Sequence, residues 1–334
     1  MDGKVTNSSA QFFIRMKKLL VTLVALVCAV VGYAQQSTLV ATLTHEETIT
    51  SYYGTFAFQK AVEAAVSGDV ITLSGGIFKA VTIDKPITVR GAGMDGDNPT
   101  IISGSFEVSA PESEHFLTFE GVKFDSNIII FKYGSSNYIN FNKCDIKSLD
   151  IYNASLISTI TNCIVRGGRI GNEDKVTMIN CLIGIEEGCL ETGISIINSV
   201  IHLNNSAHIT PGSFVNCIFV NDTDSEFSTE GICTFKNCVC IGNGDLFTNP
   251  DFCTNCYSGQ NINIFEGSDW KKPLTEAAKA TLKGDDGSDV GIYGGFLPWS
   301  TIPSYPQISK LNISKRTTED GQLSVEVKVN SVQQ

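Results

Sequence analysis

Six short segments between residues 141 and 240 repeat one pattern, and this repeat restricts the possible fold more than any other feature. Each segment has Cys or Ser at its fourth position, and these are Cys144, Cys163, Cys181, Ser199, Cys217 and Cys238. The positions are 19, 18, 18, 18 and 21 residues apart. A unit this short cannot hold two helices. The repeat therefore predicts a solenoid, in which each unit is one coil of short strands and turns stacked on the previous one.

The apolar residues of each segment have the period of a strand with one buried face. A large apolar residue opens the segments, at Phe141, Ile160, Met178, Ile196, Phe214 and Phe235. An apolar residue also stands two positions after the Cys or Ser, at Ile146, Val165, Ile183, Ile201, Phe219 and Cys240. We expect these two sets of side chains to line the inside of the coil.

Asn stands directly before the Cys or Ser in five of the six segments, at Asn162, Asn180, Asn198, Asn216 and Asn237. Asn tolerates the left-handed backbone conformation, and its amide can bond to backbone, so each Asn predicts a turn. Equivalent positions of stacked strands lie about 4.8 Å apart. We therefore expect the Asn side chains to form a ladder of hydrogen bonds, which offsets the cost of burying them.

The register of the repeat places most of the cysteines inside the coil, where a thiol behaves as a small apolar group. We predict buried thiols at Cys144, Cys163, Cys181 and Cys217. A second cluster follows, made of Cys233, Cys238, Cys240, Cys253 and Cys256. Its last two members have the C-x-x-C spacing, but no second pair and no His stands at zinc-site spacing. A late disulfide or further buried thiols are favoured over zinc or redox chemistry.

The N-terminus has the pattern of a signal peptide. Lys17 and Lys18 precede an apolar run over residues 19–31, and small residues at 32–34 are suited to cleavage. We predict an upstream extension over residues 1–15 and a signal peptide over 16–34, because the apolar run is too short to span a membrane comfortably. The chain is then an exported protein of the periplasm, the cell surface or the extracellular space, and not an integral membrane protein.

Cys28 lies inside the apolar run, where a lipid anchor is the alternative. Val27 precedes it where a small residue is expected, so we favour a leader without a lipid. The formal net charge of the 334-residue chain is −11, and 18% of its residues are charged. Nucleic acids and anionic membranes require basic patches, so we expect neither as a partner. Neutral glycans, cations or proteins fit this charge better.

The two ends of the repeat carry their own signals. Phe58, Val62 and Ala65 share one face of a predicted amphipathic helix, for which Thr55 is the expected N-cap. This helix would close the open N-terminal end of the solenoid. We assign the solenoid with its N-terminal cap to residues 35–298. A linker and a short C-terminal tail strand take residues 299–334, with the strand alternation over 323–329.

The run A-F-Q-K-A-V-E-A-A-V-S-G-D-V-I-T-L-S-G-G-I-F, residues 57–78, resembles the opening of right-handed parallel β-helix proteins of the pectin lyase-like superfamily. The Asn-Cys repeats resemble the asparagine turns of that family. S-D-V-G-I-Y-G-G, residues 288–295, resembles the segment that closes the last turns of many secreted Gram-negative members, which are largely uncharacterised. The resemblance implies an all-β, right-handed parallel β-helix solenoid with an N-terminal capping helix.

The resemblance also implies two classes of function. Enzymes of the superfamily are polysaccharide lyases or glycoside hydrolases that use acidic residues, often with calcium, and a basic residue. The candidates on one outer column are Asp150, Arg169 and His208. Units of 18 to 21 residues leave little chain for the walls of a groove. We therefore favour a non-catalytic protein that binds a polysaccharide or a cell-envelope protein along the solenoid, with the enzyme as the alternative.

Calcium is the second metal that the sequence brings into question. Asp95, Asp97 and Asn98 resemble part of a calcium loop, but their spacing does not complete an oxygen cage. We favour a simple turn there and assign no cofactor and no metal site.

The residue after each Cys or Ser should point outward, yet it is apolar in five units, at Ile164, Leu182, Val200, Ile218 and Val239. Stacked on one another, these five residues form an apolar stripe, and its exposure to water would be unfavourable. We expect the tail strand over residues 323–329 to cover this stripe, or otherwise a partner protein or the cell envelope.

Overall fold

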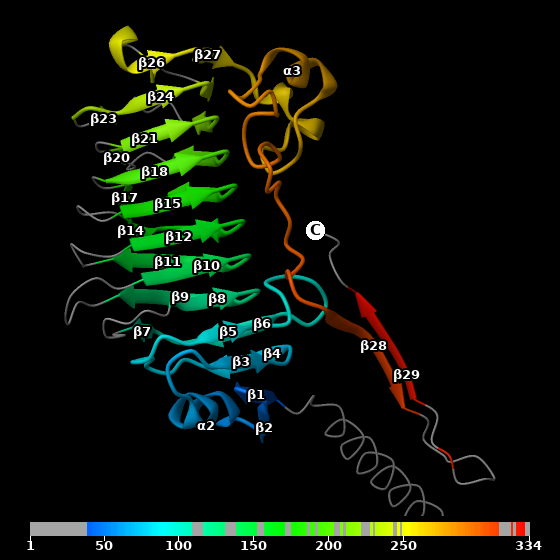
Figure 1. Cartoon of the computed structure of the whole chain (residues 1–334). Coiled ribbons are helices and arrows are strands. Elements are labelled where there is room, and N and C mark those ends of the chain that lie inside the picture. The colour runs from blue at the N-terminus through cyan, green and yellow to red at the C-terminus, as the bar shows by residue number, and fades with distance from the viewer. Residues whose placement is uncertain are drawn as a thin grey trace, which may run out of the picture. The chain divides into compact units, whose positions relative to one another are not determined.

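The computed structural model describes residues 39–330 except for 109–115, 131–137, 152–156, 171–174, 186–187, 191–192, 204–207, 210–211, 222–227, 230, 243–245, 248, 314–321 and 323–324. The predicted upstream extension and signal peptide lie outside the described residues. The described chain is a parallel β-solenoid, drawn in Figure 1, so the predicted all-β fold class is confirmed.

Three sheets run along the described part of the solenoid. The first contains twelve strands in the order β2 (Thr48–Tyr53), β1 (Val40–His45), β3 (Val70–Leu73), β5 (Thr88–Arg90), β8 (Leu117–Glu120), β10 (Tyr138–Asn142), β12 (Ile157–Thr161), β15 (Lys175–Ile179), β18 (Ile194–Ile197), β21 (Gly212–Val215), β24 (Thr234–Lys236) and β26 (Cys253–Thr254). From β3 onward all neighbours in this sheet are parallel.

The second sheet is parallel and contains β4 (Gly76–Lys79), β6 (Thr100–Ser103), β9 (Lys123–Ile130), β11 (Asp145–Ile151), β13 (Ile164–Val165), β16 (Leu182–Ile185), β19 (Val200–Leu203), β22 (Ile218–Asn221), β25 (Val239–Gly242) and β27 (Tyr257–Gln260), with β7 (Phe106–Val108) also paired to β9. The third sheet contains β14 (Gly168–Ile170), β17 (Gly188–Leu190), β20 (His208–Ile209) and β23 (Ser228–Thr229). Each repeat of the sequence is one turn that contributes a strand to the first two sheets.

The Asn residues form the sharp turns between the first and second sheets, as predicted. Asn162, Asn180, Asn198, Asn216 and Asn237 all have φ between 48° and 56°. Lys143 and Gly121 hold the equivalent place in earlier turns, with φ of 52° and 66°. One further repeat escaped the sequence analysis. Asn255 has φ of 52°, so the C-x-x-C pair is the next turn of the same series rather than a separate motif.

The buried face of the coil is also as predicted. Cys144, Cys163, Cys181, Ser199, Cys217 and Cys238 are all fully buried. Each side chain donates to the carbonyl oxygen two residues earlier, for example Cys163 Sγ to Thr161 O at 3.3 Å and Ser199 Oγ to Ile197 O at 2.9 Å. Large side chains stack in neighbouring columns, such as Phe214 on Phe235 with ring centroids 5.1 Å apart.

Burial keeps the stacked thiols neutral. It raises the pKa of the Cys181 thiol to about 12, and it raises the pKa of Cys163 and Cys238 well above the ordinary value of a thiol. All nine cysteines whose side chains are described are free thiols. The buried-thiol prediction is therefore confirmed for the repeat, and free thiols are also found in the later cluster.

A helix closes the N-terminal end of the core, as expected. Helix α2 (Ala57–Ala64) buries four residues of one face, Ala57, Phe58, Ala61 and Val62. The predicted N-cap is wrong: Phe56 holds that position, and no side chain caps the helix. The other end of the helix has a cap from a distant residue, because Lys85 Nζ donates to the carbonyls of Val62, Glu63 and Ala65 at 3.1, 3.3 and 2.9 Å.

The N-terminal hairpin is joined to the first turn by an ion pair. His45 Nδ1 lies 2.7 Å from Asp69 Oδ1, and Asp69 is buried. The hydrogen bond to this carboxylate raises the pKa of His45. The hairpin of β1 and β2 and the start of β3 are thereby held together beside α2.

The apolar stripe is covered, but by a different segment from the one predicted. Leu182, Val200, Ile218 and Val239 are at most 4% exposed. They pack in a second apolar cluster with Phe265, Leu274, Ala278, Leu282, Val290 and Ile292. We call residues 261–305 the cover. The cover contains η2 (Ile262–Ile264), η3 (Glu266–Ser268) and helix α3 (Glu276–Thr281), and Figure 1 shows it beside the sheets of the solenoid.

The tail strand is paired elsewhere. Strand β29 (Val325–Asn330) forms an antiparallel pair with β28 (Gln307–Ile313). The prediction that the tail covers the stripe is therefore wrong. The alternation of the tail strand was the visible signal, whereas the apolar residues of the cover follow no single period and gave none.

We call the second half of the cover, residues 284–305, the strap. It forms hydrogen bonds with the residues at or next to the sharp turns between the first and second sheets, which we call the turn column. Asn216 Nδ2 donates to Asp285 Oδ1 at 3.2 Å, and Asn180 Nδ2 donates to Ile292 O and Gly294 O at 2.8 and 2.9 Å. Contacts to three earlier turns follow, namely Ser300 N to Asn162 Oδ1, Lys143 Nζ to Ile302 O and Ser304 N to Glu120 Oε1. The strap thus contacts the coil turn by turn.

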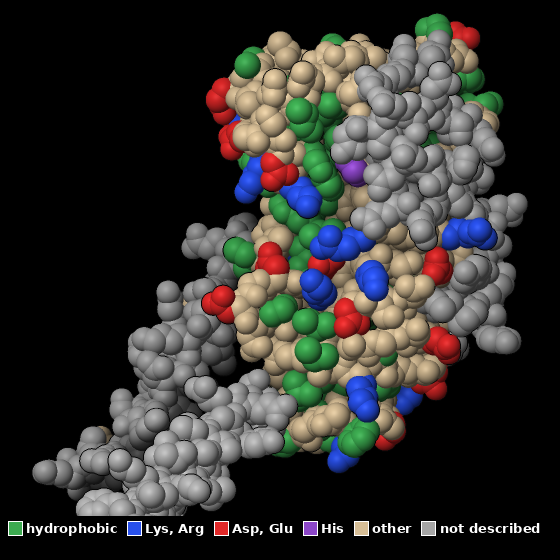
Figure 2. All heavy atoms as spheres, turned by 180° about the vertical axis from the view of Figure 1, so that it is seen from behind, with side chains coloured by type: hydrophobic (Ala, Val, Ile, Leu, Met, Phe, Trp, Pro, Cys, Tyr) green, Lys and Arg blue, Asp and Glu red, His purple; other side chains and the backbone are tan. Residues whose placement is uncertain are grey.

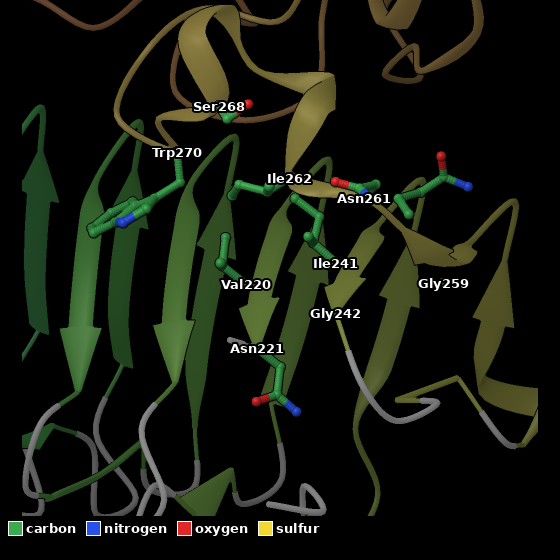
Figure 3. A pocket seen from close by; sticks show the side chains of 10 residues that line it. Val220, Asn221, Ile241, Gly242, Gly259, Asn261, Ile262, Ser268 and Trp270 are labelled. Carbon is green, nitrogen blue, oxygen red and sulfur yellow. The ribbon is translucent and has the colours of Figure 1, made fainter. Parts of the chain in front are cut away.

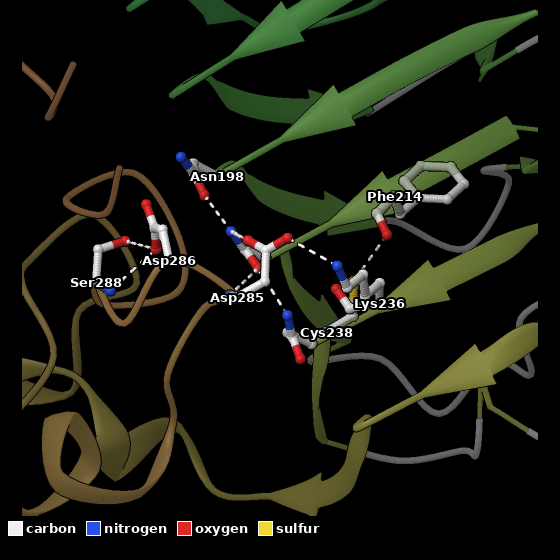
Figure 4. A network of polar contacts seen from close by, with 9 residues as sticks. Asn198, Phe214, Lys236, Cys238, Asp285, Asp286 and Ser288 are labelled. Atoms are coloured by element: carbon white, nitrogen blue, oxygen red, sulfur yellow. Dashed lines mark hydrogen bonds and ion pairs between the residues drawn. The ribbon is translucent and has the colours of Figure 1, made fainter. Parts of the chain in front are cut away.

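The predicted Asn ladder is present over part of the column only. Asn216 Nδ2 donates to Asn198 Oδ1 at 3.0 Å, and Asn237 Nδ2 donates to Asn216 Oδ1 at 3.2 Å (Figure 4). Lys236 adds an ion pair to Asp285 at 2.8 Å, and this contact lowers the pKa of Asp285. Gly295 has φ of 70°, and a Cβ there would collide with Asn198 Nδ2. The residues of the turn column therefore form hydrogen bonds with the strap as well as with one another.

Asn180→Ala should lower the free energy of unfolding by about 1–3 kcal/mol more than Asn255→Ala, because it removes a buried amide that bonds two strap carbonyls. Both positions have φ of 52°, so the backbone strain of Ala is matched, and Asn255 is exposed. Urea unfolding of the two variants measures the difference. Equal losses would show that the bonds to the strap add no stability.

Removing residues 306–334 should leave the binding of a hydrophobic dye unchanged, because the cover remains on the stripe. Removing residues 262–334 should raise dye binding strongly, because Val200, Ile218 and Val239 then face water. Fluorescence of the dye with the two shortened chains decides the matter. A rise in dye fluorescence after removal of residues 306–334 alone would show that the tail covers the stripe.

Candidate binding groove

A groove lies between the outward face of the second sheet and the cover. Its larger part has a volume of about 510 Å³ and is lined by Val220, Asn221, Ile241, Gln260, Asn261 and Trp270, among others. Its smaller part has a volume of about 210 Å³ and is lined by Arg166, Gly184, His202, Trp270 and Lys271, among others. Trp270 lines both parts, so the indole stands between them.

The repeat itself builds the floor of the groove. The parallel register pairs Gly184 with His202, His202 with Val220, Val220 with Ile241, and Ile241 with Gln260. Gly184, His202, Val220 and Ile241 follow the stripe position by two, so they also point outward. Gln260 follows Tyr257 by three and is brought opposite Ile241 by the register shift in β27. Each turn of the coil thus contributes one floor residue, and the floor crosses successive strands, as Figure 3 shows.

The cover supplies the wall. Asn261, Ser268 and Trp270 come from the irregular segment after the last strand, and Trp270 projects over the sheet in Figure 3. The expectation that short repeats leave the solenoid face without walls is therefore wrong. The wall comes from outside the repeat, from a segment whose apolar side chains are anchored on the stripe.

Trp270 is held by contacts on its ring. The ring of His202 stacks on it, with centroids 5.1 Å apart and planes 9° from parallel. Lys271 Nζ lies 5.1 Å from the centroid of the indole, at the distance of a cation–π contact. Trp270 is half-buried. A fixed aromatic group that is partly accessible is a suitable contact for the apolar part of a ligand.

The larger part of the groove carries side-chain amides. Asn221 is almost fully buried, Gln260 is half-buried and Asn261 is exposed. Asn261 Oδ1 accepts from the backbone N–H of Asn263 at 3.1 Å, which caps η2 and fixes the orientation of the amide. Amides can donate and accept at once, so this part of the groove suits hydroxyl groups.

The smaller part ends at a cluster of charges. Asp145 is 4% exposed and accepts two hydrogen bonds from Arg166, from Nε at 2.8 Å and from Nη2 at 2.9 Å. Lys123 Nζ lies 3.4 Å from the same carboxylate. Asp145 holds the stripe position in its turn, since it pairs with Ile164. Figure 2 shows Lys and Arg side chains gathered over the middle of the face seen from behind.

Two of the three candidates from the sequence, Asp150 and Arg169, lie outside the described lining of this groove. Asp150, in β11, accepts from the backbone N–H of Arg169 at 3.1 Å, so these two residues lie on neighbouring turns. The third sheet pairs Arg169 with Cys189, and Cys189 with His208, so His208 is two turns beyond Arg169. The side chain of His208 lies outside what the structure describes. Asp150 meets the backbone of Arg169 here, and no catalytic role follows from that contact.

Metal binding gains no support from the described side chains. Within the described ranges, no three His, Cys, Asp or Glu side chains are grouped to hold a metal ion, and this includes Asp95 and Asp97. The described part of the chain also has no helix long and apolar enough to cross a membrane.

The sequence analysis did not find Trp270, His202 or Asn261. His202 could have been found, because it stands two residues after Val200 in a column of outward positions. Trp270 and Asn261 lie in a segment without periodicity, and no signal in the sequence relates them to the floor.

Comparisons with known proteins add no relative. No protein-family model matches the chain, and no curated protein and no solved structure matches it. The parallel β-solenoid is thus established by the structure alone, and the resemblance to the pectin lyase-like superfamily stays a prediction.

Arg166→Ala should lower the free energy of unfolding by about 1–2 kcal/mol, because it removes two charge-assisted hydrogen bonds from a buried carboxylate. Lys123→Ala is the matched control and should cost less, since its contact is longer and single. Urea unfolding of both variants provides the measurement. A larger loss for Lys123→Ala would show that Arg166 is not the main partner of Asp145.

Proposed function

We propose that this chain is an exported β-helix protein that binds a polysaccharide in the groove and does not cleave it. The observation that carries the proposal is the combination of Trp270 with the accessible amides of Gln260 and Asn261 in one elongated depression. Sugars present hydroxyl groups at their edges and C–H groups on their faces. An aromatic ring beside several amides is complementary to both.

The shape of the groove favours an extended ligand. The floor crosses the strands of successive turns, and the two parts lie on either side of Trp270. A polymer can occupy several such positions at once, so weak contacts at each turn add up along its length. The cover supports binding by shielding one side of the polymer from water.

The scarcity of available carboxyl groups in the groove favours binding over hydrolysis. Glycoside hydrolysis ordinarily requires two carboxyl groups on either side of the bond. Among the described residues that line the two parts of the groove there is no Asp or Glu. The nearby carboxylate of Asp145 is occupied by Arg166. The basic and imidazole groups of the smaller part keep a lyase as the alternative.

A panel of acidic and neutral polysaccharides, scored for binding and for new reducing or unsaturated ends, tests the proposal. We expect at least one polysaccharide to bind, with no new ends formed. Trp270→Ala should weaken that binding by at least about tenfold, as loss of a central aromatic contact does in other interfaces.

Phe296→Ala is the matched control, because Phe296 is an aromatic residue of the strap that is 86% exposed and lies outside the groove. It should change the affinity by less than about twofold. Equal effects of the two variants would place the ligand elsewhere. Formation of new ends would show that the protein is a lyase or hydrolase instead. Absence of binding across the panel would contradict the proposal that the ligand is a polysaccharide.

A further inference from the structure

The described solenoid ends at its C-terminal side with unsatisfied backbone groups. In each turn the N–H of the turn residue donates to a carbonyl of the next turn, for example Asn180 N to Ile197 O at 3.1 Å and Asn237 N to Thr254 O at 2.8 Å. The carbonyl of the following Cys accepts from the next turn, as Cys238 O does from Tyr257 N at 2.9 Å. In the last turn these groups belong to Asn255 and Cys256, and no further turn follows among the described residues.

The core is also less closed at this end. Cys253 and Cys256 are half-buried, whereas Cys238, one turn earlier, is fully buried. Tyr257 is 42% exposed and Ile232 is 61% exposed. A cavity of about 170 Å³ lies beside them, lined by Phe235, Leu246, Phe252 and Cys253, among others. At the opposite end, α2 covers the core.

This end is not protected in the usual way. Natural edge strands carry charged residues or Pro, or are covered, so that they do not pair with other chains. β26, β27 and the turn between them, residues 253–260, contain no charged residue in a chain of net charge −11. The register of β27 shifts after Tyr257, so within this end only residues 255–257 keep the register of the earlier turns.

We propose that two copies of this chain join end to end through their last turns, across a two-fold axis. Such an axis places the N–H of Asn255 in one copy opposite the C=O of Cys256 in the other, and the reverse. A two-fold interface requires this self-complementarity. The strands of the two copies then continue one another's sheets.

A second copy fits this end better than an extended peptide. A single strand could pair with one edge, but it would leave Cys253, Cys256 and Tyr257 without cover. Another solenoid end has the same cross-section and covers both edges and the core together. Because a two-fold contact uses the same end of both copies, it closes at a dimer and does not continue as a filament.

The full chain tests the inference in analytical ultracentrifugation and small-angle X-ray scattering. We expect a dimer at about 100 µM, a concentration at which micromolar contacts are occupied. Its longest dimension should be about twice that of the monomer, as stacking of solenoids end to end requires. A chain that stays monomeric, or a dimer no longer than the monomer, would overturn the inference.

Thr254→Lys should weaken the dimer by at least about tenfold, because two like charges meet near the axis. Thr254 is exposed on β26, so the melting temperature measured at a concentration where both chains are monomeric should not change. Thr50→Lys is the matched control on β2, the exposed edge strand at the other end. It should dimerise like the unchanged chain. Loss of the dimer with Thr50→Lys but not with Thr254→Lys would assign the contact to the other end and contradict the inference.

Discussion

The hydrogen bonds between successive turns are the interaction on which the rest of this molecule depends. Each turn pairs with the next through parallel strands, and the pairing is regular only because Asn, Lys or Gly reverses the chain at the same place each time. A residue in the left-handed conformation at that corner keeps the following Cys or Ser inside. The stacked thiols, the aromatic columns and the outward stripe all follow from this one repeated corner.

The same corner creates the place where the non-repeating part of the chain binds. Amides that point out of the turns cannot all satisfy one another, because Asn180 faces the strap rather than its neighbours. The strap supplies carbonyls and N–H groups to these positions, and the apolar residues of the cover bury the stripe next to them. The cover is therefore part of the folded solenoid and not an appendage. Its attachment is what gives the second sheet a wall.

The periodic part of this fold could be predicted from the sequence, and the rest could not, for a physical reason. Positions such as Cys163 and Asn162 repeat because the same backbone geometry recurs, so one unit explains the next. The contact of Trp270 with His202 joins a single irregular segment to one point of the repeat, and no second instance exists to reveal it. Even the last turn was missed, because Cys253 and Cys256 were interpreted as a separate pair, whereas Cys253 holds the opening position of the repeat, opposite Phe235, and Cys256 holds the Cys position. The outer column of Asp150, Arg169 and His208 was predicted from spacing alone. Spacing does not indicate which face of the solenoid the cover borders.

A solenoid of short turns has little freedom to build a site from its own loops, since every added residue must be fitted between two stacked neighbours. A segment that lies across the turns avoids this limit. It contacts several repeats at once, so its side chains can approach the floor from above while the coil stays regular. In this chain the apolar stripe sets where that segment lies, and the floor residues two positions further along each strand become the opposite side of the groove. The apolar residues at outward positions of the repeat are thus the physical link between the fold and the candidate site: they anchor the cover, and the anchored cover places Trp270.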